Sequence, residues 1–345
     1  FEDVGRYVLV GVRQGGKSYM LFRRAKQLLA EGHSIQEILY VDFDDERLIE
    51  MTATNFDSIL QAHKSLYSCQ PILFFDEIQN VRGWEHFARR LANQKYQVYI
   101  TGSNARMLSR DIHTTLGSRF RDEIIYPYSF SEYLEAQGIK LSHGWKYGSQ
   151  RDIVRRLLND YILWGGFPEC ILYKDKRRWL NDAYEKILLN DIILRNRIKN
   201  ELSLRLTIKR LAESVTKPIS YNRIANLIKG TGISISPSTV MQYTGYAKDA
   251  FALFPLSNYA SKFVEKETVK KFYFIDNGLL SIFLSESISP LLENVCAIQL
   301  LRQFGKELHF YNKNIEVDFY IPDRRLAIQA CANLSDDSTR EREIK

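Results

Sequence analysis

Short apolar runs alternate with amphipathic segments over the first 130 residues of the chain. Apolar residues recur at helical spacing in three segments, at about 19–29, 47–64 and 84–93. Four apolar runs predict buried strands, at 7–10, 37–43, 71–76 and 97–101. Regular alternation of strands and helices is typical of a parallel sheet covered by helices. The pattern therefore predicts an α/β domain over residues 1–130.

The rest of the chain is mostly helical up to about residue 250. Helical spacing is found at 152–161, 179–200, 202–215 and 221–229, and again from Ser236. Two strand-like segments, 251–256 and 271–275, follow. After residue 286 we expect a helix to Phe304 and then three strands, at 307–311, 316–321 and 325–331. The charged last ten residues read as the start of a helix that is cut short, so we expect an incomplete C-terminus.

Length and composition restrict the class of protein. With 345 residues, 45% hydrophobic residues and eight prolines, the chain is globular and long enough for two or three domains. No apolar run approaches 18 residues, and no signal peptide is recognisable, although Phe1 indicates a trimmed N-terminus. The four cysteines form no C-x-x-C pair, which favours reduced thiols in a cytoplasmic protein.

Basic charge is concentrated in one part of the chain. Between Lys174 and Lys229 there are 14 Lys/Arg and six Asp/Glu, a surplus of eight, while the whole chain has a net charge of +7. A local surplus of this kind indicates a polyanionic partner. Solvated helix faces explain it equally well.

The strand predicted at 7–10 runs directly into a phosphate-binding motif. Residues 11–18, GVRQGGKS, match G-x-x-x-x-G-K-[ST] between a strand and a helix. Backbone N–H groups and a helix N-terminus favour a bound phosphate, with the lysine on the β- and γ-phosphates and the serine on Mg²⁺. The predicted nucleotide-binding residues are Gly11, Val12, Arg13, Gln14, Gly15, Gly16, Lys17, Ser18 and Tyr19.

Two carboxylates follow the strand predicted at 71–76. A buried parallel strand delivers Asp76 to the edge of the sheet where ligands bind. In that position Asp76 would hold Mg²⁺ through its water shell, and Glu77 would act as the general base for the attacking water. About 60 residues separate these acids from the phosphate motif. The pair therefore predicts the second half of a site for ATP or ADP with Mg²⁺.

Candidate residues from two later segments complete the predicted site. At the end of the strand 97–101, Asn104 or Ser103 would contact the γ-phosphate or the lytic water, unless Asn104 only caps a helix. Arg119, with Arg121 second, is the candidate arginine finger, given in cis or by a neighbouring subunit. A surface salt bridge is the alternative for this arginine.

Together these motifs, with Gly117-Ser118-Arg119 leading into Tyr126–Phe130, resemble AAA-type ATPases of the additional-strand catalytic-glutamate class. More narrowly, the chain resembles prokaryotic ATPases that carry a winged helix and a nuclease-like C-terminal domain. The resemblance implies a P-loop sheet with an added strand at about 37–43, and a helical lid that includes the turn Trp164–Glu169. From its residues alone, this turn is a structural elbow without chemistry. Gln14-Gly15 departs from the arginine and small residue of many relatives.

Residues 201–285 are consistent with a winged helix. The helix 221–229, a short Gly turn and the helix from Ser236 precede the two strand-like segments. In DNA-binding versions the second helix enters the major groove. Here that helix has few basic residues, and the basic surplus lies before it. Both a double-stranded DNA partner and a protein-packing role therefore remain open.

Residues 286–345 resemble a degenerate PD-(D/E)XK nuclease. Glu293 and Asp318 match acidic positions, but Gln329 replaces the second strand acid and Cys331 replaces the lysine. A neutral amide is a poor Mg²⁺ ligand, and a thiol supplies no ammonium charge. We expect a nuclease-like fold without nuclease activity.

These observations predict a cytoplasmic Mg²⁺-dependent ATPase with Lys17 and Glu77 at its catalytic centre. The main hypothesis couples ATP hydrolysis to DNA binding through the winged helix. A regulatory or scaffold ATPase that acts on protein partners, with assembly into a homo-oligomer, is the alternative. An active nuclease is the third.

Overall fold

A computed structural model describes residues 5–284 and 288–332. The helix start predicted in the last ten residues lies outside the described residues. The chain separates into two compact units, Phe1–Tyr126 and Pro127–Lys345. The second unit contains all three segments that follow the predicted α/β domain. Their division into separate domains stays a prediction.

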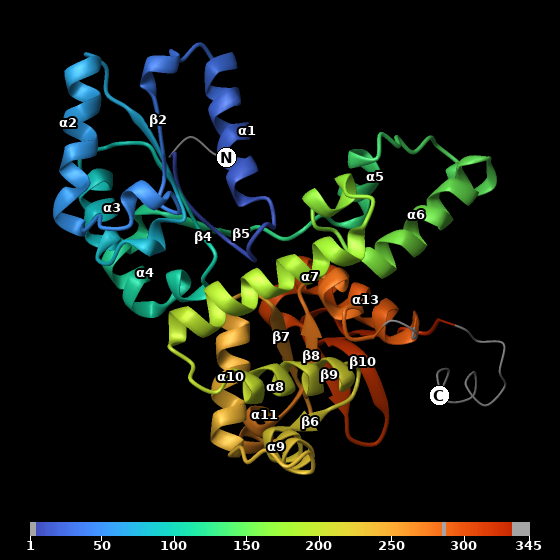
Figure 1. Cartoon of the computed structure of the whole chain (residues 1–345). Coiled ribbons are helices and arrows are strands. Elements are labelled where there is room, and N and C mark those ends of the chain that lie inside the picture. Colours follow the sequence, from blue (N-terminus) through green and yellow to red (C-terminus); the bar gives the residue numbers. More distant parts are fainter. Residues whose placement is uncertain (1–4, 285–287, 333–345) are drawn as a thin grey trace. The chain divides into compact units, whose positions relative to one another are not determined.

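The first unit contains a five-stranded parallel sheet (Figure 1). Its strands are β1 (Arg6–Val10), β2 (Ile38–Asp42), β3 (Ile72–Asp76), β4 (Val98–Gly102) and β5 (Arg121–Ile124). They are hydrogen-bonded in the order β2-β3-β4-β1-β5. The α/β fold and the four strands predicted from apolar runs are confirmed.

The strand between β1 and β3 is not the one at 37–43. That segment forms β2, which precedes β3 in the sequence as expected but lies at the edge of the sheet, paired only with β3 in the described strands. Instead β4 lies between them, because Val98 is level with Arg6 of β1 and with Leu73 of β3. The end of β4 is thus next to the ends of both strands that carry the nucleotide motifs.

Helices cover both faces of this sheet because successive strand residues point to opposite sides. Leu21 and Leu28 of α1 (Lys17–Ala30) pack on the face that carries Tyr7 and Phe74. On the other face, the ring of Phe75 contacts Phe87 of α3 (Trp84–Asn93), 6.0 Å between centroids. Both faces of the central strands are therefore buried, which explains their unbroken apolar runs.

The helix predicted over 47–64 begins later than expected. Only α2 (Phe56–Leu66) is α-helical there, and two single 3₁₀ turns precede it. Thr52 and Asn55 form reciprocal side-chain to backbone hydrogen bonds just before Phe56. Such capping interactions start a new helix and interrupt the periodic pattern. A short helix, α4 (Arg110–Leu116), precedes β5.

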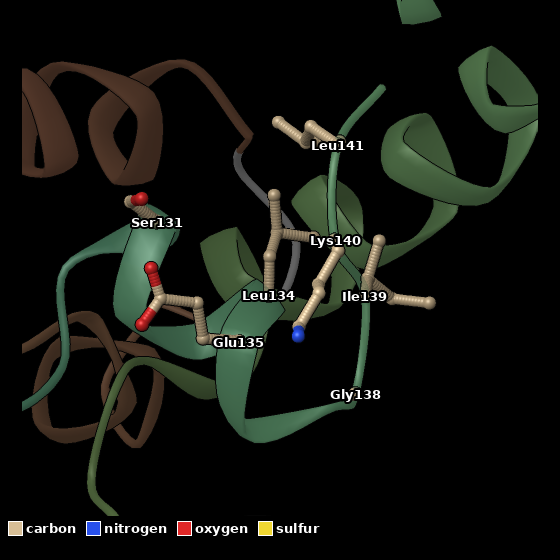
Figure 2. A pocket seen from close by; sticks show the side chains of 7 residues that line it. All are labelled: Ser131, Leu134, Glu135, Gly138, Ile139, Lys140 and Leu141. Atoms are coloured by element: carbon tan, nitrogen blue, oxygen red, sulfur yellow. The ribbon is translucent and has the colours of Figure 1, made fainter.

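The second unit begins with helices. They are α5 (Phe130–Ala136), α6 (Gln150–Trp164), α7 (Lys176–Lys186), a π-helix that continues it (Ile187–Leu194), and α8 (Glu201–Glu213). Ser129 caps α5 in a capping box with Glu132. A pocket lies beside α5 (Figure 2). Its lining contains none of the site residues predicted from the sequence and consists of Ser131, Leu134, Glu135, Gly138, Ile139, Lys140 and Leu141.

Three helices and three antiparallel strands follow in one continuous stretch. In chain order the elements are β6 (Ile219–Ser220), α9 (Tyr221–Lys229), α10 (Pro237–Asp249), β7 (Leu253–Ser257), α11 (Phe263–Thr268) and β8 (Val269–Phe274). The strands pair in the order β6-β8-β7. Ser236 caps α10, and Pro237 occupies its first turn, where the missing N–H is harmless.

A second antiparallel sheet closes the described chain. It follows α12 (Asn277–Ser281) and α13 (Ile288–Phe304) and contains β9 (His309–Asn312), β10 (Glu316–Ile321) and β11 (Leu326–Ile328). Asn258, just after β7, bonds to both backbone groups of Asn312 and so joins the two sheets. Among the described residues, no helix combines the length and the apolar character needed to cross a membrane.

Candidate functional site

The phosphate motif forms a tight loop between β1 and α1. The N–H of Gly11 donates to the carbonyl of Gly102 at the end of β4 (3.3 Å), and a Cβ at Gly11 would lie 2.1 Å from the carbonyl oxygen of Ile125. Only glycine fits between these two strand ends. The N–H of Gly15 donates to the carbonyl of Val12 (3.1 Å), which curls the loop. The predicted strand–loop–helix context is therefore present.

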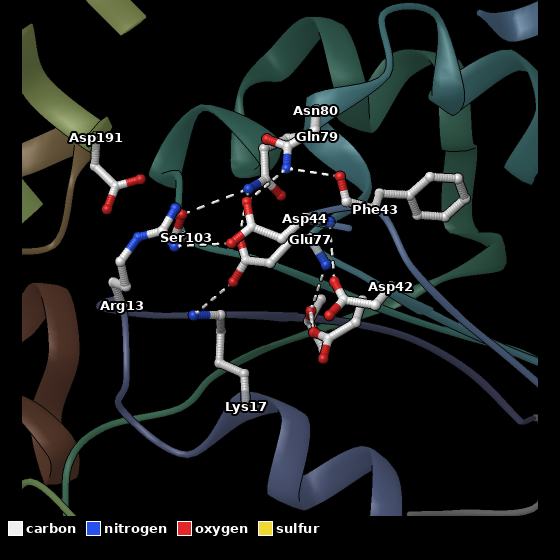
Figure 3. Close-up of polar contacts among 12 residues, drawn as sticks. Arg13, Lys17, Asp42, Phe43, Asp44, Glu77, Gln79, Asn80, Ser103 and Asp191 are labelled. Carbon is white, nitrogen blue, oxygen red and sulfur yellow. Dashed lines mark hydrogen bonds and ion pairs between the residues drawn. The ribbon is translucent and has the colours of Figure 1, made fainter. Parts of the chain in front are cut away.

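Lys17 and Glu77 meet at this loop. The buried Lys17 Nζ lies 3.2 Å from Glu77 Oε1 and donates to the carbonyl of Val12 at 3.2 Å (Figure 3). The Glu77 side chain is only 12% exposed. Burial acts to raise the pKa of Glu77, but the neighbouring charge of Lys17 and a hydrogen bond from Gln79 lower it to about 2. Glu77 is therefore ionised, and its negative charge pairs with the positive charge of Lys17.

Asp76 is fixed by two hydroxyl groups. Tyr40 of β2 donates to Asp76 Oδ2 at 2.8 Å, and Thr101 of β4 donates to Asp76 Oδ1. The same Thr101 oxygen accepts the N–H of Glu77 at 3.0 Å. Glu77 has a left-handed backbone (φ 50°), a strained conformation that these contacts hold in place. Thr101 therefore positions both carboxylates, a role that the sequence analysis missed.

Gln79 is the second missed residue. Its amide nitrogen donates to Glu77 Oε2 and contacts Ser103 Oγ at 3.4 Å (Figure 3). Within the described residues, the amide oxygens of Gln79 and of Gln14 in the loop are buried without a hydrogen-bond partner. Buried polar atoms of this kind commonly receive a ligand or a water. Both atoms are acceptors, so they suit a water molecule or another hydrogen-bond donor in the site.

The donor set suits a nucleotide and Mg²⁺. Ser18 is the second residue of α1, after Lys17, and Asp76 ends the buried strand β3, so a hydroxyl and a carboxylate come from the two elements the motif requires. Hard oxygen ligands are those that Mg²⁺ prefers. Both Asp76 oxygens already accept a hydrogen bond. This arrangement leaves Asp76 suited to hold the ion through coordinated water.

Asn104 acts as a helix cap in this structure. Its side-chain oxygen accepts the N–H of Arg106 at 2.9 Å, at the start of a 3₁₀ helix (Ala105–Leu108). This is the alternative considered from the sequence. A contact between Asn104 and a nucleotide stays a prediction.

Arg119 lies near the end of the sheet where β1 and β5 begin, whereas the phosphate loop lies at the opposite end. It precedes β5, whose first residue Arg121 is level with Tyr7 near the start of β1, whereas the loop follows the end of β1. Its Nε donates to Asn93 Oδ1 at the end of α3 (2.7 Å). Within its own chain Arg119 thus lies away from the phosphate loop, and the finger role, which the sequence left open in cis or in trans, stays a prediction. The strand direction, which sequence spacing does not reveal, is the cause.

The Gly-Gly elbow in the second unit is held by a distant carboxylate. Asp276 Oδ2 accepts the N–H of Gly166, and Oδ1 accepts the N–H of Gly278, both at 2.7 Å. Asp276 is buried, and its burial raises its pKa to about 7, although the two N–H groups act in the opposite direction. The elbow is therefore a structural element, as its residues predicted, and its partner lies 110 positions away in the sequence.

The nuclease-like positions form a closed cluster. Glu293 of α13 and Asp318 of β10 both lie near Lys271 of β8, at 3.6 and 3.0 Å from its Nζ. Burial raises the pKa of Glu293 to about 7, against the opposing effect of Lys271. Gln329 accepts the N–H of Asp318 at 3.1 Å and is thus a strand contact. The sequence analysis found the two acids but missed the lysine.

The parallel sheet and the loop give the first unit the fold of a P-loop NTPase. A family model described as "AAA domain" matches residues 5–134, and a model described as a domain of unknown function (DUF8612) matches residues 155–288. The five-stranded parallel sheet with the loop after β1 agrees with the first match. This class implies nucleotide binding.

The chain belongs to the same family as two curated proteins. It is 33% identical over 347 residues to the uncharacterized protein MJ1544 of Methanocaldococcus jannaschii, which covers 98% of this chain and 77% of that protein. It is 30% identical over 341 residues to an uncharacterized protein of Haemophilus influenzae, covering 92% and 83%. The similarity therefore extends over both units.

Two solved structures are distantly similar to this chain. The Walker-type ATPase PABY2304 of Pyrococcus abyssi has 13% identity and a TM-score of 0.45, covering 81% of this chain and 90% of that one. Cdc6p of Pyrobaculum aerophilum has 12% identity and a TM-score of 0.29, covering 85% and 88%.

Proposed function

We propose that this protein binds ATP with Mg²⁺ and hydrolyses it, with Glu77 as the general base. The observation that carries the proposal is the approach of Glu77, which follows β3, to Lys17 of the phosphate loop, with 3.2 Å between Oε1 and Nζ. A lysine for the phosphates and a carboxylate for the attacking water are the two charged groups that this chemistry requires. Ser18 and Asp76 would hold Mg²⁺, which would neutralise phosphate charge when bound.

Each of the site residues then has a defined task. Lys17 leaves Glu77 and binds the phosphates, while Glu77, released from that ion pair, orients the attacking water and accepts its proton. Thr101 keeps Asp76 and Glu77 in register through its single hydroxyl. An arginine-finger role for Arg119 requires a second copy of the chain, because this residue lies at the opposite end of its own sheet from the loop. We therefore propose a homo-oligomer as the active form.

Lys17→Ala is expected to weaken ATP binding about 10- to 100-fold, because charge-assisted hydrogen bonds to the phosphates are lost. Titration of a fluorescent ATP analogue into the full-length protein measures this affinity. Lys26→Ala, an exposed position on the same helix, serves as the matched control and should bind as the wild type does. Unchanged affinity in Lys17→Ala would exclude the loop as the nucleotide site.

We propose DNA as the second partner, through residues 201–274 acting as a winged helix. The order helix, strand, helix, helix, strand, short helix, strand supports this, as do exposed basic residues on α9 and α10, namely Arg223, Lys229 and Lys248. Other basic residues of the 174–229 segment form salt bridges within the chain. Arg205 pairs with Glu185, and Arg210 pairs with Glu213, both at 2.6 Å. The available basic charge is therefore smaller than the composition alone indicates.

Duplex binding measured across a salt series tests this partner. We expect affinity to fall steeply as salt rises, and the combined variant Arg223→Ala/Lys229→Ala to reduce the slope of log K against log salt by about two. Lys64→Ala, exposed in the first unit, should leave the slope unchanged. Absence of salt-dependent binding would favour the alternative, a scaffold ATPase with protein partners.

A further inference from the structure

A lysine occupies the centre of the nuclease-like acidic cluster. Lys271 lies on β8, outside the segment that carries the nuclease-like positions, and its side chain is 0% exposed. Three carboxylates surround its Nζ, from Asp318 at 3.0 Å and from Glu293 and Glu316 at 3.6 Å each. The ring of Phe310 lies 5.6 Å from the same nitrogen. The ammonium group is therefore enclosed by negative charge and one aromatic ring.

Hydrogen bonds fix two of these carboxylates, those of Glu293 and Asp318, whereas the Glu316 side chain is 53% exposed. Tyr273 donates to Glu293 Oε1 at 2.6 Å, and the N–H of Ala330 donates to Asp318 Oδ2 at 3.1 Å. Gln329, at the position of the missing acid, accepts the N–H of Asp318. In the part of the chain that the structure describes, no group of three or more His, Cys, Asp or Glu side chains is arranged to hold a metal ion. The acids are thus arranged around the ammonium group.

Electrostatics explains why a cation is needed here. Carboxylates that are buried together repel each other, and a buried ammonium group without counter-charges is equally unfavourable. In an acidic centre of a metal-dependent enzyme, a divalent ion supplies the positive charge. Here Lys271 reaches the centre of the acidic cluster from β8, which belongs to a different sheet from β10. Its side chain is inaccessible to any substrate.

We infer that the ammonium group of Lys271 takes the place of a divalent metal ion in this acidic centre. The centre is thereby a structural ion cluster that joins β8, α13 and β10, and it requires no metal. This inference concerns the second unit and is independent of the proposed ATPase activity.

Lys271→Met tests the charge separately from the packing, because methionine has a similar length and no charge. We expect the thermal midpoint of the full-length protein to fall by about 10 °C, since three carboxylates lose their counter-ion. Adding Asp318→Asn should recover part of this loss by removing one negative charge. Lys270→Met, the neighbouring position on β8, is the matched control and should shift the midpoint far less, since Lys270 pairs with Glu267, whose side chain is exposed. Equal midpoints for wild type and Lys271→Met would overturn the inference.

Mn²⁺ binding, followed by electron paramagnetic resonance without nucleotide, is the second measurement. Wild type should show no Mn²⁺ binding that depends on Asp318. In Lys271→Ala, which opens space beside the acids, Mn²⁺ should bind and raise the thermal midpoint, and adding Asp318→Asn should abolish both effects. Mn²⁺ binding by wild type that is lost in Asp318→Asn, or Mn²⁺-dependent DNA cleavage lost in Asp318→Ala, would overturn the inference even if Lys271→Ala fails to fold.

Discussion

Glu77→Gln should reduce ATP turnover by about 100-fold or more, while the protein still binds ATP. Glutamine preserves the size of the side chain and its contact with Gln79, but it cannot accept a proton from the attacking water. Loss of a positioned general base typically lowers rates by about 10²- to 10⁴-fold. Steady-state phosphate release, measured at saturating ATP, gives the effect on turnover.

The same variant should bind ATP at least as tightly as the wild type. Glu77 Oε1 lies 3.2 Å from Lys17 Nζ, so bound phosphates must compete with this carboxylate for the lysine. Because the pKa of Glu77 is lowered to about 2, the competition persists at every pH near neutrality. Glutamine removes the charge and leaves Lys17 free for the phosphates. Weakened binding would show that the ion pair organises the loop.

A control separates this effect from general damage to the first unit. Glu50→Gln alters an exposed carboxylate of the same unit and should leave both turnover and affinity unchanged. Turnover by Glu77→Gln at the wild-type rate would remove Glu77 from the mechanism. It would not affect the assignment of the loop, which the Lys17 variant tests separately.

The phosphate loop could be predicted because its signal is local. The residues from Gly11 to Ser18 are consecutive, and the apolar runs on β1 and β3 follow directly from burial of both faces of the sheet. Asp76 and Glu77 could be found for the same reason. In both cases the motif and the apolar strand that positions it lie within a few consecutive residues.

Residues that act through distant partners could not be predicted in this way. Thr101 looks like any strand residue until β4 is known to lie beside β3, and Lys271 looks like a surface lysine until α13 and β10 cover it. For Arg119 the sequence left cis and trans open, since its position near the motifs in sequence gives no strand direction. In each case the pairing of elements, which a single sequence does not encode locally, decides the role.

Gly165→Ala should destabilise the second unit by more than about 3 kcal/mol. A Cβ at this position would lie 1.9 Å from Asp276 Oδ1 and 2.6 Å from the nitrogen of Gly278, both of which are buried. The backbone also has φ 73° and ψ −162°, a region open almost only to glycine. The backbone strain and the steric overlap of the new Cβ therefore add. If the chain relieves the overlap by moving the Asp276 carboxylate away from the elbow, buried N–H groups lose their acceptor. Chemical denaturation followed by tryptophan fluorescence, with Trp164 adjacent to the elbow, measures the loss.

Gly138→Ala is the matched control, because Gly138 has a similar φ of 75° in the same unit but open space around its Cβ position. It carries the backbone strain without the overlap and should lose only about 1 kcal/mol. Similar losses for the two variants would mean that the chain moves freely away from Asp276. The elbow would then not depend on this carboxylate.

The pH dependence of stability identifies Asp276 as the partner. Its pKa is raised from 3.8 to about 7 in the folded protein, so the folded state holds a proton that the unfolded state releases. The stabilising contribution is therefore full below pH 4 and is lost as the pH rises towards 7, by no more than about 4 kcal/mol. Asp276→Asn removes this titration and, since its NH₂ group cannot accept an N–H, also leaves one buried donor unpaired. The stability gap between wild type and Asp276→Asn should thus narrow between pH 4 and pH 7, whereas a gap that is constant over this range would show that Asp276 remains ionised and holds the elbow as a charged acceptor.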